Sequence, residues 1–413
     1  MALIRRGLTL FLLLGVSVVA AQEISPLEPP DTGRYLRWGP FRVRPSLTIP
    51  TFGYDDNVFY RTDEEPRVGD YFLDISPGVE GVVLFGNRAF VTFAEKLEFY
   101  AYANEHDANY FNQFGRARVT FPLGNYGVYV DGGYDRIRDR PADATDVRPI
   151  RKEIPFGGGM IFKFGWRTDV EIGYAKTRFT GEDPDDPCAD PSTGCFTIGQ
   201  RIDRDEAGAR LLARYLLFGR TRFTLRASER DIVFDDPAVQ RDAHERRILP
   251  GLDFGLRGRV YGNVRVGWAN FDLENPAAED FQGGVADIAV GYRLGGLGST
   301  LYLRGYRDVQ YSVLESTDLF TNTGAELTFV RYFNRFIGME VGGGRGTLDF
   351  LGANTRKDDI SRGSAGIRFR LSENDLGRRV EYAFRYVLTR RNSNLDFLDQ
   401  TRGTIGFGMS FGY

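Results

Sequence analysis

Apolar and polar residues alternate along nearly every segment of the chain after residue 40. In 126–134, 166–174, 207–215 and 363–371, every second residue is apolar or glycine, with Thr168 as the exception, and charged or polar residues stand between many of them. Successive side chains of a β-strand point to opposite faces, so a period of two predicts strands. The pattern therefore predicts many strands, each with one apolar face and one polar or charged face.

The connections between these strands alternate between tight turns and long polar loops. Glycine and asparagine mark the tight turns, where a positive φ is needed: Gly86-Asn87, Gly124-Asn125, Gly165, Gly219-Arg220, Arg257-Gly258, 295–298, Asn334-Arg335 and 372–377. The long loops are expected at 55–69, 103–110, 136–154, 179–203, 231–247, 270–282, 307–321, 347–361 and 391–400. Eight turns and nine loops give seventeen connections and hence eighteen strands, with sixteen as the alternative count.

Short turns on one side, long loops on the other and an even strand number are typical of outer-membrane barrels. Lipid offers no hydrogen bonds to the backbone, so a membrane-spanning sheet must close on itself. We therefore predict that residues 41–413 form an all-β, antiparallel, up-and-down transmembrane β-barrel, with tilted strands of about 9–11 residues. Prolines in or near strands should lie at bulges or strand ends, above all at Ser76-Pro77-Gly78; the others are Pro45, Pro50, Pro122 and Pro250.

Both ends of the chain carry targeting features. Residues 1–21 have two arginines, an apolar stretch and a small-residue cleavage site, which predicts a signal peptide. Residues 22–40 are then a periplasmic lead-in or partial plug. The last strand alternates from Ile405 to an aromatic residue at Tyr413, which resembles the signal that the barrel-insertion machinery recognises. We expect a bacterial outer-membrane protein whose partners are lipid and that machinery.

Composition excludes several functions. The formal net charge is -3, which leaves no basic footprint for nucleic acid. The two histidines, His106 and His244, fall in sequences that predict polar loops, and no catalytic site, metal site or cofactor is expected. Gly408–Gly412 fits the G-x-S-x-G pattern, but no helix follows the serine as a hydrolase requires. Cys188 and Cys195 lie in one Pro- and Asp-rich loop, where we expect a local disulfide after export.

Rows of charged residues occupy the face opposite the apolar one. If the apolar face meets lipid, the charged face lines the lumen, where it either fills the wall as ion pairs or selects the passing solute, such as an anionic sugar chain. The candidate lumen residues are Arg116, Arg118, Arg210, Arg214, Arg222, Arg226, Arg304, Arg368, Arg370, Asp169 and Glu171, and the same logic places Asp131 and Glu98 inward.

One segment carries a family resemblance. Tyr54, Asp55, Asp56, Asn57, Val58 and Phe59 follow the first predicted strand, and Asp70 and Ile75–Gly78 come after them. This arrangement resembles the family known as β-barrel porin 2, which implies an outer-membrane pore with a role in polysaccharide secretion. From the residues alone, the Asp and Asn side chains here favour a structural role, in which they fold the loop through bonds to the backbone.

Three functions remain open from the sequence. The first is a pore for export of exopolysaccharide or capsular polysaccharide, working with a periplasmic export partner, as the resemblance implies. The second is a general or solute-selective diffusion porin. The third is an outer-membrane enzyme or adhesin, which would depend on His106, His244 or the Cys188–Cys195 loop.

Overall fold

The computed structural model describes residues 27–33, 35–138, 149–182, 195–255, 258–295, 298–312, 318–352, 356–373 and 379–412. The predicted signal peptide, Cys188 and Tyr413 lie outside these residues.

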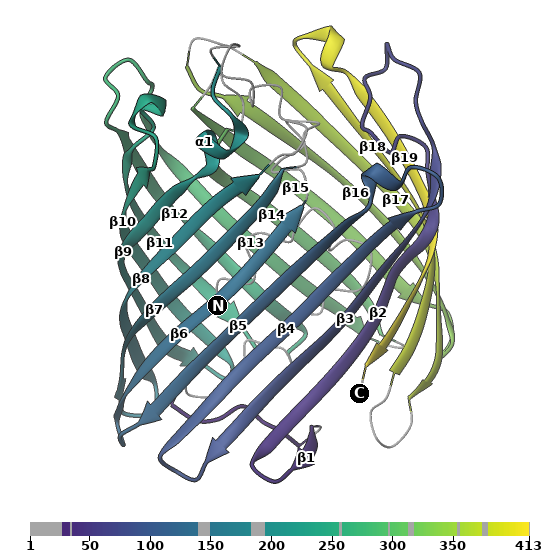
Figure 1. The fold of residues 1–413 in the computed structure, drawn as a ribbon. Helices are drawn as coiled ribbons and strands as arrows, with labels where there is room; N and C mark the ends of the chain where they lie inside the picture. The colour runs from purple at the N-terminus through teal and green to yellow at the C-terminus, as the bar shows by residue number, and fades with distance from the viewer. Residues whose placement is uncertain are drawn as a thin grey trace.

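The described residues form a closed antiparallel barrel (Figure 1). Each strand from β2 to β18 pairs with the next along the chain, and β19 pairs with β2 through contacts such as Ile405↔Tyr54. Strand β1 pairs only with the start of β2, so eighteen of the nineteen strands make the wall. The predicted fold class and the count of eighteen are confirmed, and the alternative of sixteen strands is wrong.

The strands are β1 (Leu36–Trp38), β2 (Phe41–Asp55), β3 (Asp70–Phe85), β4 (Ala89–Tyr102), β5 (Tyr110–Pro122), β6 (Tyr126–Arg138), β7 (Ile150–Phe164), β8 (Thr168–Glu182), β9 (Arg204–Phe218), β10 (Thr221–Phe234), β11 (Ala243–Phe254), β12 (Val260–Leu273), β13 (Phe281–Gly295), β14 (Ser299–Tyr311), β15 (Leu319–Tyr332), β16 (Ile337–Phe350), β17 (Lys357–Glu373), β18 (Arg379–Ser393) and β19 (Gln400–Gly412). The helices are α1 (Ile198–Ile202) and the 3-10 helices η2 (His106–Ala108), η5 (Pro237–Val239) and η6 (Asp396–Leu398).

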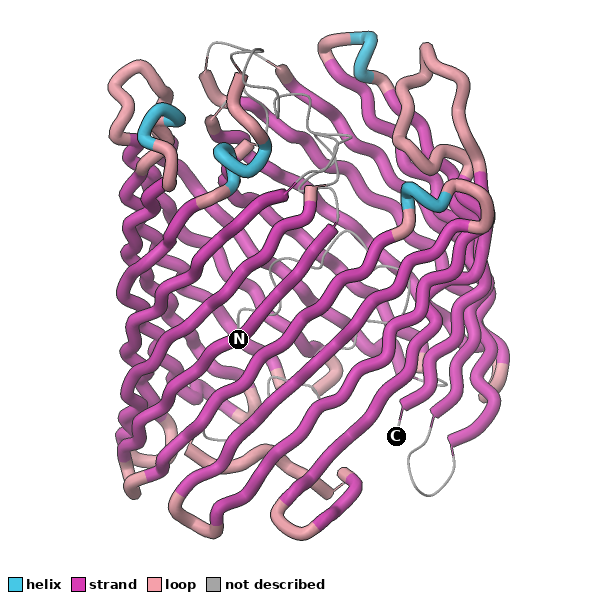
Figure 2. The backbone as a smooth tube through the Cα atoms, in the orientation of Figure 1, coloured by secondary structure: helices cyan, strands magenta, loops and turns pink. Residues whose placement is uncertain are grey.

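The wall strands are longer than the sequence indicated. Strands β2–β19 contain 12 to 17 residues, and the connection expected at 231–247 covers only 235–242. The alternation of apolar side chains stops before the strands do, because their outer ends carry charged residues on both faces. Figure 2 shows the helices at the end of the barrel that holds the long loops.

The two faces of each strand differ as predicted. Outward residues such as Ile248, Val266 and Ile367 are about half exposed, which is the surface that a lipid-facing wall requires. Gly86, Gly124, Gly165 and Gly219 adopt a positive φ in the tight turns. No helix among the described residues is long and apolar enough to cross a membrane.

Only one of the expected proline bulges is a true register shift. The pairing of β2 with β3 shifts between Thr48 and Thr51, around Pro50. At Ser76–Gly78 the expectation of a bulge was wrong: Pro77 pairs with Leu47, and the register between β3 and β4 is the same on either side of the proline. A proline lacks only the N–H donor, so the strand continues without that one bond.

Candidate functional site: the charged lumen

Ion pairs line the inner face of strands β5–β9. Arg118 on β5 lies 2.7 Å from Glu171 on β8 and 3.2 Å from Asp131 on β6. Arg210 on β9 binds the same Asp131 at 2.7 Å. Side chains from strands that are not neighbours in the sheet, such as β5 and β8, meet only on the concave side of a closed wall. These residues therefore point into the lumen.

The same network includes two more of the candidate arginines. Arg214 pairs with Asp169 and lies 3.8 Å from Glu171, and Arg116 pairs with Asp135 on β6. Arg118 also lies over the ring of Tyr129, with its guanidinium carbon 3.8 Å from the ring centroid. Asp131 and Glu171 are thus each shared by two arginines, which links β5, β6, β8 and β9 across the inner face.

Strand β10 places its arginines on the inner face as well. Arg222 and Arg226 share a face with Arg230, and the residues between them, such as Phe223, point outward. Arg230 lies 2.5 Å from Glu206 and also pairs with Glu245.

A second network covers β14–β18. Arg304 lies 3.6 Å from Glu326, and Arg368 pairs with Glu340 and lies 2.8 Å from Glu381. The structure thus places these two arginines among inner-face carboxylates.

Arg370, the last of the candidate lumen residues, lies over the ring of Tyr332 at 4.0 Å. Tyr332 in turn donates a hydrogen bond to Glu381. Every candidate lumen residue from the sequence therefore lies on the inner face, whereas its part in transport remains a proposal.

The paired charges are not equally exposed to the lumen. The Arg118 side chain is 28% exposed and its partner Glu171 only 8%, and the same order holds for Arg116 with Asp135 and for Arg230 with Glu245. In these three pairs the water of the lumen therefore meets the guanidinium group rather than the carboxylate, whereas Asp131 is 25% exposed and Asp169, at 16%, is more exposed than Arg214, at 9%. We call Lys96, Arg116, Arg118, Arg210 and Arg230 the cationic wall; they lie on β4, β5, β9 and β10.

The order is reversed in the pairs that Arg265 and Arg247 form with aspartates. Arg265 is 4% exposed, while its partners Asp253 and Asp287 are 21% and 30% exposed. Arg247 is buried behind Asp308, at 2.8 Å. We call Asp253, Asp287 and Asp308 the acidic wall; they lie on β11, β13 and β14.

The outer end of the β14–β15 hairpin leaves the barrel wall and enters the lumen. Pairing between β13 and β14 ends at Ala286↔Arg307, although both strands continue. Pairing between β14 and β15 goes on to Tyr311↔Leu319. The two strands leave β13 together. We call 308–312 and 318–321 the inward hairpin.

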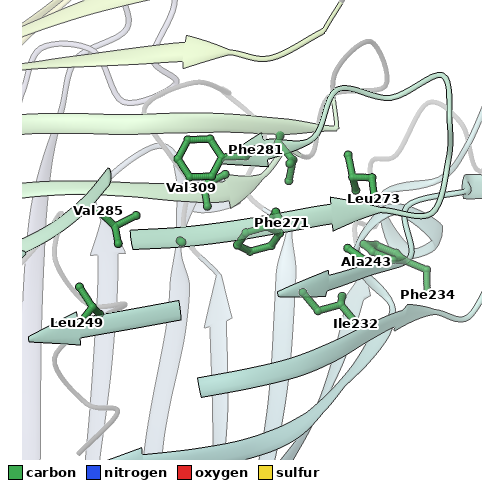
Figure 3. Packing of buried hydrophobic residues seen from close by; sticks show 11 residues of the cluster. Ile232, Phe234, Ala243, Leu249, Phe271, Leu273, Phe281, Val285 and Val309 are labelled. Carbon is green, nitrogen blue, oxygen red and sulfur yellow. The ribbon is translucent and has the colours of Figure 1, made fainter. Parts of the chain in front are cut away.

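Apolar side chains hold this hairpin against the inner wall. Val309 and Leu319 are almost fully buried in one cluster with inner-face residues of β10–β13, among them Ile232, Phe271 and Val285. Figure 3 shows Val309 among the side chains of this cluster. The face of β14 and β15 that elsewhere meets lipid is here turned onto the inner wall.

Polar contacts attach the hairpin to the β10–β11 loop. Arg241 lies 2.8 Å from Asp318, and it donates a hydrogen bond to the Ser312 carbonyl at 2.9 Å. The Tyr311 hydroxyl donates to the Arg241 carbonyl at 3.1 Å. The Arg241 side chain is 3% exposed, so this is a buried attachment.

The segment before β1 also contacts the inner face. Leu27 is buried against Tyr129 and Ile161, and Glu28 lies 3.5 Å from Lys163. Tyr129 and Ile161 belong to β6 and β7, near the tight-turn end. The described part of the lead-in thus narrows the lumen at the end opposite the inward hairpin.

The motif at 54–59 joins the first loop to the last strand. Asp55 is fully buried and lies 2.5 Å from Arg402 on β19, and Tyr102 donates a hydrogen bond to it at 3.3 Å. Asp56 accepts a hydrogen bond from the backbone N–H of Gly403 at 2.6 Å. These bonds lie where β19 meets β2, so they close the outer end of the barrel seam.

Asn57 and Val58 fix the loop itself. Asn57 accepts a hydrogen bond from the Arg61 backbone N–H and donates to the Arg61 and Thr401 carbonyls. Val58 is fully buried against Phe72 and Tyr100.

The two aromatic residues of the motif lie on its periphery. Tyr54 points outward and stacks edge-on against Tyr71, and Phe59 is partly exposed. The segment thus folds the loop through side-chain bonds to the backbone, as its Asp and Asn residues indicate.

One histidine does not lie where we expected. His244 is on the outward face of β11, not in a polar loop, and its ring nitrogens lie 2.6 Å from Asp231 and 2.9 Å from Glu229. The expectation failed because a strand that continues above the lipid carries charges on both faces. His106 begins η2 in the β4–β5 loop. Cys195 is disulfide-bonded, and since Cys188 lies outside the described residues, their pairing remains a prediction.

No family model and no curated protein matches the sequence. Several solved porins are similar in fold. A BenF-like porin from Pseudomonas fluorescens Pf-5 is 11% identical, with a TM-score of 0.49 over 90% of this chain and 99% of that one. OccK2 (OpdF) from Pseudomonas aeruginosa is 11% identical, with a TM-score of 0.49 over 90% and 98%. Acinetobacter baumannii OccAB3 is 9% identical, with a TM-score of 0.48 over 90% and 99%.

At such identities the likeness concerns the fold alone, so the function must be argued from this chain's own lumen. The closed wall, the apolar outer surface and the charged interior together define the class of protein. The chain is a closed, eighteen-stranded antiparallel β-barrel of the bacterial outer membrane.

Proposed function

We propose that the barrel is a solute-selective diffusion porin for small polar solutes that carry an anionic group. The observation that carries this proposal is the unequal exposure within the ion pairs of the cationic wall. Charged groups that line a pore set which ions pass, and here the arginines stand in front of their carboxylates. A carboxylate or phosphate on the solute can contact successive guanidinium groups along this wall.

The inward hairpin supports small solutes over polymers. It occupies part of the lumen, and its apolar contacts with β10–β13 hold it there. Asp253 and Asp287 of the acidic wall lie on neighbouring strands, and Asp308 is the first residue of the hairpin itself. A small solute passes between surfaces of opposite charge, and the hairpin leaves less of the lumen for a polymer. Export of exopolysaccharide, which the family resemblance implies, is therefore the less favoured function.

The test is the ion selectivity of the refolded barrel in a planar bilayer under a KCl gradient. Arg118→Gln with Arg210→Gln should lower the permeability of chloride relative to potassium, and Asp253→Asn with Asp287→Asn should raise it. Arg246→Gln changes an outward-facing arginine and serves as the matched control. Equal selectivity in all three variants would contradict the proposal.

The polysaccharide alternative has its own measurement. Alginate added to either side of the bilayer should leave the conductance of the wild-type barrel unchanged. Block by alginate at low concentration would favour the export function instead.

A further inference from the structure

A carboxylate lies on the lipid-facing side of the wall, well away from the charged strand ends. Glu95 is in the middle of the 14-residue strand β4, and its outward neighbours on that strand are Phe93 and Leu97. Across the sheet it pairs with Val79 on β3 and Gly115 on β5. The inward face of β4 carries Lys96 and Glu98 instead. The side chain of Glu95 therefore points to lipid in the central part of the apolar band.

Glu95 is held flat against the wall by one hydrogen bond. The amide of Gln113, outward-facing on β5, donates to Glu95 Oε1 at 2.7 Å. The other carboxylate oxygen lies above Gly115, where a Cβ atom would approach it to 2.6 Å. Glycine at this position thus leaves the space in which the carboxyl group lies.

Small residues continue this surface. Ala117 pairs with Gly132 on β6, and both point outward beside Gly115. Exposed side chains of Val130 and Phe156 border them. These small residues form a flat area of the outer surface next to the hydrogen-bonded pair of Glu95 and Gln113. We call Glu95, Gln113, Gly115, Ala117 and Gly132 the β4–β6 patch.

Such a pair is costly against lipid and is rarely placed there without a function. After their mutual hydrogen bond, Glu95 keeps one carboxylate oxygen as an acceptor and Gln113 keeps one N–H donor. Neither group has a further hydrogen-bond partner among the described residues. A two-fold symmetric contact places the same patch on both copies, so donor meets acceptor twice. Small residues in membrane proteins let two surfaces approach closely enough for such bonds.

We propose that the β4–β6 patch is the contact between two copies of this chain in the membrane. Glu95 of each copy accepts a hydrogen bond from Gln113 of the other, and the small residues form the flat centre of the contact. The reciprocal donor and acceptor favour a second copy over a different membrane protein, which would have to carry the matching pair itself.

Cross-linking tests this contact in the full barrel refolded into lipid vesicles. Ala117→Cys places a thiol in the patch, and Val266→Cys places one on the outward face of β12, away from it. With a short bis-maleimide, Ala117→Cys should form dimers and Val266→Cys should remain monomeric. A monomer in both cases, or equal cross-linking in both, would overturn the proposal.

A second variant tests whether the Glu95–Gln113 pair itself stabilises the dimer, or whether the two surfaces only lie close together. In the Ala117→Cys background, Glu95→Leu should lower the dimer fraction by about tenfold, the effect of losing two reciprocal hydrogen bonds. Glu95→Gln retains both a donor and an acceptor and should preserve the dimer. Heat-modifiable migration on gels confirms that each variant is folded. If Glu95→Leu folds and dimerises as well as the wild type, Glu95 does not hold the contact.

Discussion

Single residues connect parts of this chain that are far apart in sequence. Asp55, Asn57 and Arg402 show this best, because Asp55 ends β2, Asn57 lies at the start of the first loop and Arg402 is on the last strand. Asp55 is fully buried and Arg402 is its charged partner, so each neutralises a charge that would otherwise be desolvated alone.

Replacing Asp55 by Asn should destabilise the barrel by about 3–5 kcal/mol, the usual cost of leaving one member of a buried pair unpaired. The measurement is urea unfolding of the refolded protein in vesicles, followed by tryptophan fluorescence. Arg67→Ala breaks the more exposed pair with Asp63 in the same loop and should cost less than about 1 kcal/mol. Equal losses in the two variants would contradict the buried-pair explanation.

The face of the wall on which a side chain lies can be predicted from the sequence. The period of two predicts the inner face correctly for every candidate lumen arginine, because alternate residues of a strand point to the same face. The choice of partner cannot be predicted in this way. Arg118 binds Glu171 three strands away, and that contact depends on the curvature of the wall.

At the scale of elements, the inward hairpin is the main departure from the sequence-based expectation. Residues 307–321 were expected to form a polar outer loop, but Val309, Tyr311, Leu319 and Phe320 lie within them. Four large apolar side chains in a loop were a signal that it packs against something. Nothing in the local sequence says that the packing surface is the inner face of β10–β13.

Removing the attachment of the hairpin should widen the pore. Arg241→Ala breaks the pair with Asp318 and the bond to the Ser312 carbonyl, so the hairpin should leave its site more often. We expect a higher single-channel conductance and more frequent transitions between levels than in the wild type. Arg345→Ala, on the outward face of β16, is the control. An unchanged conductance in Arg241→Ala would mean that apolar packing alone fixes the hairpin.

At the scale of the whole molecule, the strand count and closure follow from the order of turns and loops. Eight tight turns and nine long connections require both chain ends on the same side, and β19 then meets β2. The lengths of the strands could not be predicted as well, because the period of two ends where the lipid ends, whereas the hydrogen-bonded ladder continues above it.

The stability lost when a charge is introduced on the outer surface should depend on how deep that position lies in the lipid. Ile367→Arg, near the middle of β17, should destabilise the barrel by about 2–4 kcal/mol, while Asp359→Arg, at the outer end of the same strand, should cost about 0–1 kcal/mol. Urea unfolding in vesicles measures both. Similar costs at the two positions would mean that the lipid boundary lies elsewhere on the wall.

The parting of β13 and β14 has a consequence for where the hydrocarbon of the bilayer must stop. Beyond Ala286↔Arg307, no strand among the described residues pairs with the β14 side of 281–285, although Arg307 donates one hydrogen bond to the Gly284 carbonyl at 3.0 Å. Acyl chains cannot satisfy such groups, whereas water and lipid headgroups can. The point at which β13 and β14 separate therefore sets an upper limit to the hydrocarbon of the outer leaflet. The acyl chains can reach the level of Arg307 but not the unpaired backbone beyond it.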